Sequence, residues 1–338
     1  MSHPPTGLRW GILGTGLIAQ THVIAALQSA ERCDVTAIAS RTMDRANDVA
    51  SKFAIPQAYG SYEDLLADAE IDCVYLPLPN HLHTPWIIRA AEAGKHILCE
   101  KPLTLTSAEA ATVAERCAAN GVQVMEAFMY RFHPAWVTTL GLLADGAIGR
   151  VTDVAIWFAF RSTRPTDYRH DVGAGGGALY DVGCYAVDAS RMLLGDGPGN
   201  VLGTARIDPA SGVDLTFSGI LDYGDSFATF TVSMEQEPVH AVIIHGTEGW
   251  LSIADPFNCP PDMATTITIG SGGDHHPHAS NTRTFAVPAA DQYGLQATAL
   301  VDAVLHDEPA PLPIEGSIAN MLILERLFTA AGIEPPPG

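Results

Sequence analysis

The chain has 338 residues, of which 47% are apolar and 17% are charged. It carries 18 Lys and Arg residues against 38 Asp and Glu residues, which gives a formal net charge of −20. Nucleic acid and membrane surfaces are therefore poor partners, because binding to either requires clustered basic residues. The length predicts two domains, and the apolar content predicts a substantial buried core.

The sequence also bears on location and on metal binding. The first residues show no basic stretch followed by an apolar run, and no apolar run approaches the roughly 20 residues that span a bilayer. We therefore expect a cytoplasmic protein. The cysteines are scattered and form no C-x-x-C motif, which favours reduced core thiols over disulfides or structural zinc. They are Cys33, Cys73, Cys99, Cys117, Cys184 and Cys259.

The first part of the chain alternates short apolar runs with segments of helical spacing. The predicted strands are 10–13, 35–39, 73–76, 96–99 and 122–125, and the predicted helices are 18–30, 44–53, 62–69, 84–93 and 107–120. Ser107 marks the expected start of the last of these helices. This repetition predicts a parallel sheet covered on both faces, as in a doubly wound Rossmann domain. The pattern ends near Met129, so we place this domain at residues 1–128.

Within the remaining residues, 129–338, the pattern of predicted elements changes after Gly149. Strand-like runs are predicted at 151–161, 213–223, 226–234, 241–246, 250–254, 265–269 and 283–287, followed by helices at 292–305 and 317–331. The links between these strands are short, and those at 222–226 and 246–249 have the composition of hairpin turns. We therefore expect an α+β domain with a large, mainly antiparallel open sheet, and an α/β protein overall.

A glycine-rich loop follows the first predicted strand, with the sequence Gly11-Ile-Leu-Gly14-Thr-Gly16-Leu-Ile-Ala19. In a G-x-G-x-x-G/A loop, Gly14 permits the tight turn and Gly16 lets the backbone approach a pyrophosphate. The helix that follows offers free N–H groups and a positive dipole end to the phosphates. The loop therefore predicts dinucleotide binding rather than a structural turn.

The end of the second predicted strand favours NADP over NAD. NAD sites usually place Asp or Glu there to accept hydrogen bonds from the ribose. This chain has Ser40 and Arg41, with Arg45 one helical turn further on. A hydroxyl and two guanidinium groups suit a 2′-phosphate. The alternative is that Arg41 is a solvated charge in a loop.

Further motifs are distributed along the whole chain. They are Pro77-Leu-Pro-Asn80-His-Leu-His83, Ala93-Gly-Lys-His96, Glu100-Lys101-Pro102 and Gly175-Gly-Gly-Ala-Leu-Tyr-Asp181-Val-Gly-Cys-Tyr185. Together with the glycine loop, they resemble the glucose-fructose oxidoreductase, inositol dehydrogenase and MocA (Gfo/Idh/MocA) family. The resemblance implies a nicotinamide-dependent oxidoreductase acting on sugars, cyclitols or related diols. It also implies a homodimer or homotetramer formed through the open face of the second sheet.

The resemblance implies roles for individual residues. Lys101 matches the family's active-site lysine at the nicotinamide, and Asp181 and Tyr185 match its D-x-x-x-H/Y pair. Tyrosine at position 185 resembles the subgroup that contains glucose-fructose oxidoreductase, xylose dehydrogenase, dihydrodiol dehydrogenase and some sugar 3-ketoreductases. The segment 125–134 is similar to the xylose and dihydrodiol dehydrogenase branch. The expected cofactor contacts are Gly14, Gly16, Leu17, Ile18, Ser40, Arg41, Arg45, Leu76, Pro77, Asn80, His83, Glu100 and Lys101.

The chemistry of these residue types fits alcohol oxidation. A base must take the hydroxyl proton, and an isolated tyrosine, with a pKa of about 10, is a poor base. A neighbouring ammonium favours the phenolate, so Lys101 beside Tyr185 would supply a base and a donor to the developing alkoxide. Asp181, four residues before Tyr185, is expected on the same helical face. The alternatives are that Tyr185 is a packed aromatic residue and that Asp181 caps the glycine-rich turn.

Other candidates carry weaker signals. For Asn80 and His83, a role in ordering the loop competes evenly with ligand binding. Arg131 and Arg164 are candidate substrate contacts, with a structural or surface role as the alternative. The same alternatives apply to Arg161, Arg169 and His133. His275, His276 and His278 lie in a Gly-rich setting without partnering Cys or carboxylates, which predicts a loop and no metal site.

We expect an NADP-dependent aldose dehydrogenase, of xylose or glucose type, that oxidises the anomeric carbon to a lactone. A keto-sugar reductase or a dihydrodiol dehydrogenase would use the same residues. A hydrolase that uses its cofactor transiently also belongs to the family that the chain resembles. A fourth alternative, from a different class, is an NADP-binding redox sensor without turnover.

Overall fold

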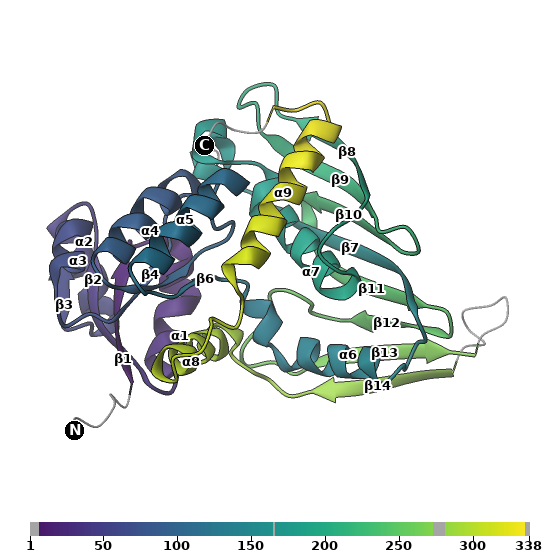
Figure 1. The fold of residues 1–338 in the computed structure, drawn as a ribbon, viewed down its shortest axis with the longest axis horizontal. Coiled ribbons are helices and arrows are strands. Elements are labelled where there is room, and N and C mark those ends of the chain that lie inside the picture. The colour runs from purple at the N-terminus through teal and green to yellow at the C-terminus, as the bar shows by residue number, and fades with distance from the viewer. Residues whose placement is uncertain (1–6, 165, 273–280, 335–338) are drawn as a thin grey trace. The chain divides into compact units, whose positions relative to one another are not determined.

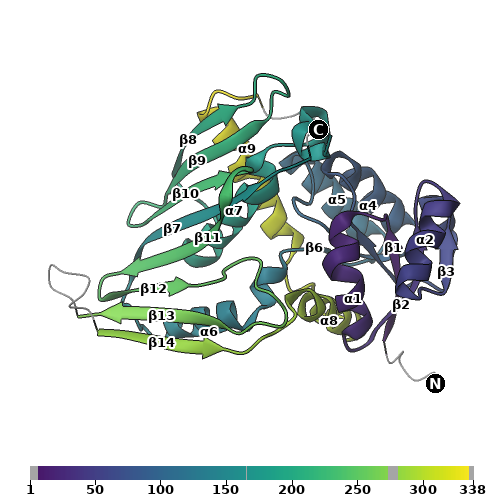
Figure 2. The ribbon, with the colours of Figure 1, turned by 180° about the vertical axis from the view of Figure 1, so that it is seen from behind.

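The computed structural model describes residues 7–164, 166–272 and 281–334 (Figures 1 and 2). These residues form two compact units. The first contains the chain up to Phe128 together with Tyr293–Ile318, and the second contains Met129–Gln292 and the residues from Ala319 onward. The histidines His275, His276 and His278 lie outside the described residues, so their predicted loop is not part of this description.

The first unit is built on a six-stranded parallel sheet in the order β3-β2-β1-β4-β5-β6. The strands are β1 (Leu8–Leu13), β2 (Cys33–Ala39), β3 (Gln57–Tyr59), β4 (Cys73–Leu76), β5 (His96–Cys99) and β6 (Val124–Glu126). The chain adds strands on one side of β1 and then on the other, so the order reverses between β1 and β4. In open parallel sheets, ligands bind at the carboxyl ends of the strands at such a reversal.

Helices cover both faces of this sheet. They are α1 (Ile24–Ser29), α2 (Met43–Phe53), α3 (Tyr62–Ala67), α4 (His83–Glu92), α5 (Ser107–Ala119) and α8 (Gln292–Leu305). Helices α4 and α5 lie on one face and α1 on the other (Figures 1 and 2). Helix α8 packs beside α1 through stacked rings of His22 and Tyr293 and an ion pair between Arg32 and Asp302.

One helix start differs in detail from the expectation and another agrees with it. The predicted helix 18–30 contains a π-helical turn, Ala19–Val23, before α1. Helix α5 begins at Ser107, as expected, and the preceding Thr106 caps it, because its hydroxyl accepts the N–H of Glu109 at 3.1 Å.

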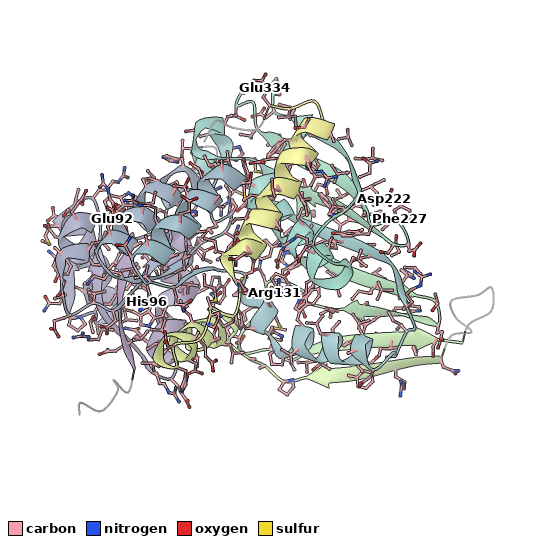
Figure 3. The ribbon with its side chains drawn as sticks, in the orientation of Figure 1. Glu92, His96, Arg131, Asp222, Phe227 and Glu334 are labelled. Carbon is pink, nitrogen blue, oxygen red and sulfur yellow. The ribbon has the colours of Figure 1, made fainter. Side chains whose placement is uncertain are left out.

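The second unit is built on an eight-stranded sheet in the order β14-β13-β12-β11-β7-β10-β9-β8. Its strands are β7 (Val151–Arg161), β8 (Asn200–Ile207), β9 (Asp214–Asp222), β10 (Phe227–Ser233), β11 (Glu235–Gly246), β12 (Gly249–Ile253), β13 (Thr265–Ser271) and β14 (Asn281–Val287). Strands β7 and β10 pair in parallel and every other pair is antiparallel. The predicted fold class is thereby confirmed, including the hairpin in which Asp222 pairs with Phe227 (Figure 3).

Helices pack on one face of the second sheet (Figures 1 and 2). They are α6 (Pro134–Ala144), α7 (Cys184–Leu194) and the second-unit part of α9 (Ile314–Ala330). The opposite face presents Trp157, Ile220 and Ile243, which the strand register places on one side and which are partly exposed. Oligomerisation through this sheet stays a prediction.

The described residues also bear on membranes, metals and disulfides. Within the described ranges, no helix has the length and apolar character needed to cross a membrane. In the same part of the chain, no three His, Cys, Asp or Glu side chains cluster as metal ligands would. All six cysteines are free thiols, and five of them are buried.

Candidate active site

The candidate residues of the first unit lie at or just beyond the carboxyl ends of β1, β2, β4 and β5. The glycine loop with Leu17 and Ile18 follows β1, and Ser40, Arg41 and Arg45 follow β2. Leu76 ends β4 and Pro77, Asn80 and His83 follow it, while Glu100 and Lys101 follow β5. Because β1 lies between β2 and β4, these loops meet at one edge of the sheet, where the strand order reverses.

The glycine loop has the close backbone approach that a pyrophosphate needs. Gly14 has a φ of +130°, and its N–H donates to the Ala39 carbonyl at 3.0 Å. A Cβ atom on Gly16 would lie 2.8 Å from the Pro77 carbonyl oxygen, too close for a side chain to fit. Residue 16 must therefore be glycine for the loop to pack this closely against the segment that follows β4. The loop fits a dinucleotide, because Gly14 and Gly16 place no side chain between the backbone and a pyrophosphate.

The end of β2 gathers positive charge beside the glycine loop. Ser40 is buried, Arg41 is exposed, and the Arg45 guanidinium donates to the Thr15 hydroxyl at 2.7 Å. Burial raises the pKa of the Tyr62 hydroxyl, while the charges of Arg41 and Arg45 act against that rise. Both guanidinium groups therefore lie near the same hydroxyl, and Arg45 is tied to the loop that follows β1.

Glu100 and Lys101 are held at the end of β5 by contacts with β4. The Glu100 N–H donates to the Leu76 carbonyl at 3.2 Å, and the Tyr75 hydroxyl donates to the Glu100 carboxylate at 2.6 Å. Lys101 is half-buried, and its peptide bond to Pro102 is cis. Tyr75 is fully buried, so its hydroxyl fixes one carboxylate oxygen of Glu100 from within the core.

His83 is enclosed by backbone carbonyl groups. Its ring is fully buried, Nδ1 lies 2.8 Å from the Pro102 carbonyl oxygen, and Nε2 lies 2.8 Å from the Leu78 carbonyl oxygen. Burial lowers the pKa of His83 to about 4, so the ring is neutral at pH 7 and donates to only one of the two carbonyls. These contacts join the loop after β4 to the turn after Lys101 and favour a role in ordering the loops.

This burial predicts an acid-sensitive contribution to stability. The unfolded chain takes up a proton at His83 near pH 6.5, while the folded chain does so only near pH 4. The contribution of His83 to the free energy of unfolding is therefore fully present above pH 6.5. It falls by up to about 3 kcal/mol as the pH drops towards 4. Chemical denaturation across this range should show a smaller fall in the His83→Gln variant. The exposed His306→Gln is the control and should follow the wild type; an unchanged fall in His83→Gln would contradict the assignment.

In the second unit, Tyr185 lies in an aromatic cluster. It is 4% exposed, and its ring packs against Tyr130, Phe158 and Phe257 at centroid distances of 5.8, 5.3 and 5.5 Å. Its hydroxyl lies 3.5 Å from the sulfur of Met129. The cluster fixes the ring of Tyr185, so its hydroxyl has a defined direction at the start of α7.

Asp181 is paired with an arginine. It is 4% exposed, and its carboxylate accepts the Nε–H of Arg169 at 2.7 Å; Arg169 also contacts Asp167. The charge of Asp181 raises the pKa of Arg169, so the guanidinium stays ionised. Of the three arginines before the glycine run, Arg169 is the one that reaches the D-x-x-x-Y segment.

The other predicted arginines point elsewhere. Arg164 is exposed, and Arg161 pairs with Glu237 on the surface. Arg131, labelled in Figure 3, donates to Asp188 at 3.0 Å within the second unit, and Tyr130 donates to the same carboxylate. Asp188 lies one turn after Tyr185 on α7, so Arg131 supports the helix that carries Tyr185.

Two residues of this site were missed by the sequence analysis. Tyr75 lies inside a buried strand, and Asp214 begins β9, where its carboxylate accepts the Leu179 N–H at 2.7 Å. Asp214 is 35 positions from Leu179. Neither position has a local sequence signal, because both act on residues distant in the chain.

This arrangement defines a dinucleotide-binding fold joined to a separate sheet domain that carries a tyrosine and a carboxylate. Residues 8–128 match the model of the oxidoreductase family with an NAD-binding Rossmann fold. Residues 136–252 match the C-terminal domain of the same family, GFO/IDH/MocA. The chain belongs to the Gfo/Idh/MocA family of oxidoreductases, so the predicted family and the predicted nicotinamide cofactor class are confirmed.

Individual relatives match nearly the whole chain. An uncharacterized oxidoreductase from Rhizobium meliloti is 41% identical over 96% of this chain and 97% of its own length. The D-xylose 1-dehydrogenase (NADP(+)) 2 of Haloferax volcanii is 40% identical over the same shares. Among solved structures, a 3-ketoreductase from Actinomadura kijaniata in complex with NADP and TDP-benzene is 29% identical, with a TM-score of 0.88 over 96% of this chain and 98% of that one.

Proposed function

We propose that this oxidoreductase uses NADP to oxidise an aldose of xylose or glucose type at the anomeric carbon, giving a lactone. The observation that carries the proposal is the presence of Lys101 after β5 and of Tyr185 in a packed aromatic cluster, in a chain 40% identical to an NADP-dependent xylose dehydrogenase over 97% of that relative. The substrate is therefore a small sugar or polyol.

The residues that would hold the cofactor divide by its chemistry. The backbone from Gly14 to Gly16 would receive the pyrophosphate, and Arg41 and Arg45 would bind the 2′-phosphate. Glu100, oriented by Tyr75, would accept hydrogen bonds from ribose hydroxyls. When bound, NADP supplies the acceptor for the hydride that leaves the carbon being oxidised.

Protein side chains would remove the proton of the sugar hydroxyl. In this proposal, Tyr185 takes that proton as a phenolate, and Lys101 donates a hydrogen bond to the same substrate oxygen. A nearby ammonium favours both the phenolate and a developing alkoxide. The packed ring of Tyr185 keeps its hydroxyl in one direction, which general base catalysis requires.

The role proposed for Asp181 is not that of a general base. Its carboxylate already accepts a charged hydrogen bond from Arg169 and has further acceptor capacity, which suits a hydrogen bond from a second sugar hydroxyl. The pair would thus orient the sugar ring while Tyr185 acts on the reacting hydroxyl.

A panel of substrates tests the proposal. Purified protein with NADP should show formation of NADPH with xylose or glucose, and much less with NAD. The similarity in fold to a 3-ketoreductase favours keto-sugar reduction as the second candidate, so nucleotide-linked keto-sugars with NADPH belong in the same panel. A dihydrodiol completes it. Reaction with only a keto-sugar or a dihydrodiol would overturn the aldose assignment, and NADP binding without any turnover would instead indicate a sensor.

A further inference from the structure

The helix that carries Asp181 and Tyr185 begins against a carboxylate from another part of the fold. The helical segment starts with a π-helical turn, Leu179–Gly183, and continues as α7. Asp214, at the start of β9, is 3% exposed, and its Oδ2 accepts the Leu179 N–H at 2.7 Å. The N–H of Ala178 also hydrogen-bonds this carboxylate. Two of the first N–H groups of the helix are thereby satisfied by one side chain.

Gly177 completes this contact. It has a φ of +111°, and a Cβ atom built on it would overlap Oδ1 of Asp214. The carboxylate therefore fills the space that a side chain at residue 177 would need. The Gly177 N–H donates to the Arg169 carbonyl, and its own carbonyl accepts the Asp181 N–H, both at 3.0 Å. The backbone around Gly177 thus links Asp214 to both members of the Arg169–Asp181 pair.

The burial of this carboxylate has an energetic cost. Desolvation raises the pKa of Asp214 to about 7, although the hydrogen bonds from backbone N–H groups act in the opposite direction. An ordinary packing position would be filled more favourably by an apolar side chain. A buried carboxylate is useful where several N–H groups at a helix start must be oriented together, because it accepts from all of them and complements the helix dipole.

We propose that Asp214 is a positioning residue for catalysis: its carboxylate fixes the start of the helix and so the directions in which Asp181 and Tyr185 project. The inference rests on the proposed roles of Asp181 and Tyr185. Asp214 acts through the backbone of Gly177–Leu179 and does not touch the substrate. A small rotation of this helix start would displace the Tyr185 hydroxyl from the substrate oxygen, and a displacement of about 1 Å can cost on the order of 10²-fold in rate.

The test uses two variants that disturb the contact from opposite sides. Asp214→Asn keeps the shape but replaces one acceptor oxygen by an N–H₂ group facing backbone donors, and Gly177→Ala displaces the carboxylate. Both should lower kcat roughly 10- to 100-fold, while the dissociation constant of NADP, measured by fluorescence titration, stays at the wild-type value. With a sugar deuterated at the reacting carbon, the isotope effect on kcat should rise, because misplacement slows the chemical step. A loss of folded enzyme alone would leave the isotope effect unchanged.

Asp222→Asn is the matched control. Asp222 ends the same strand, and its carboxylate caps an exposed turn at the Gly224 N–H, so this variant should keep wild-type kinetics. Wild-type kcat in both test variants would overturn the proposal and leave the proposed function standing. If the wild type turns over no substrate, hydrogen exchange decides the inference separately. The amides of residues 178–185 should exchange faster in Asp214→Asn, and unchanged exchange there would overturn it.

Discussion

Replacing Lys101 by alanine or Tyr185 by phenylalanine is expected to lower kcat by roughly 10²- to 10⁴-fold, the range associated with loss of general acid–base catalysis. Tyr185→Phe removes only the hydroxyl and keeps the ring that packs against Phe158 and Phe257. Because this packing is kept, the melting temperature should change little. Steady-state kinetics combined with thermal unfolding separates the loss of chemistry from the loss of fold.

Two controls share the residue types. Lys52→Ala removes an exposed lysine on α2, and Tyr223→Phe removes a hydroxyl in the turn after β9. Both variants should retain wild-type kcat. A near-wild-type kcat in either Lys101→Ala or Tyr185→Phe would remove that residue from the mechanism.

Replacing Arg41 by alanine should raise the KM for NADP by roughly 10- to 100-fold while changing the KM for NAD little. A hydrogen bond to a charged group contributes about 1.5 to 3 kcal/mol, and the two cofactors differ only in the 2′-phosphate. The effect should be large in this chain, because a net charge of −20 otherwise repels the phosphate. Arg45 is the less selective target, since it also supports Thr15 in the glycine loop.

The change of cofactor preference is measured from the ratio of kcat/KM for NADP to that for NAD. Arg89→Ala is the control, because Arg89 is also exposed on the first unit but pairs with Glu63 on α3. Its ratio should match the wild type. Equal effects of Arg41→Ala on both cofactors would show that the 2′-phosphate is bound elsewhere.

The elements predicted from sequence were those with clear periodicity and clear stops. Strand β7 and helix α8 have the predicted bounds, because an alternating apolar pattern and a helical pattern are both unambiguous there. Two strands and one α-helix were not predicted at all. Strand β3 has three residues, edge strand β8 is mostly exposed, and helix α6 contains β-branched residues and a glycine that weaken its helical signal. Helix α7 was expected only through the spacing of Asp181 and Tyr185, without bounds.

The candidate site was predictable where its residues belong to one short sequence motif. The glycine loop and Glu100-Lys101-Pro102 fall at strand ends, so the sheet topology alone brings them to one edge. The partners of the motif residues were not predictable. Sequence spacing does not say that Arg169 rather than Arg164 meets Asp181, or that Asp214 meets Leu179, because the tertiary packing of separate segments decides both.

The transfer of deuterium from the anomeric carbon of the sugar tests the central claim most directly. Wild-type protein is incubated with NADP and an aldose, xylose or glucose, that carries deuterium only at that carbon, and the reduced cofactor is analysed by mass spectrometry. The proposed function predicts one deuterium in NADPH, together with the lactone, and product formation roughly 10²- to 10⁴-fold slower with Lys101→Ala. NADPH without deuterium, or no NADPH from any aldose, would contradict it.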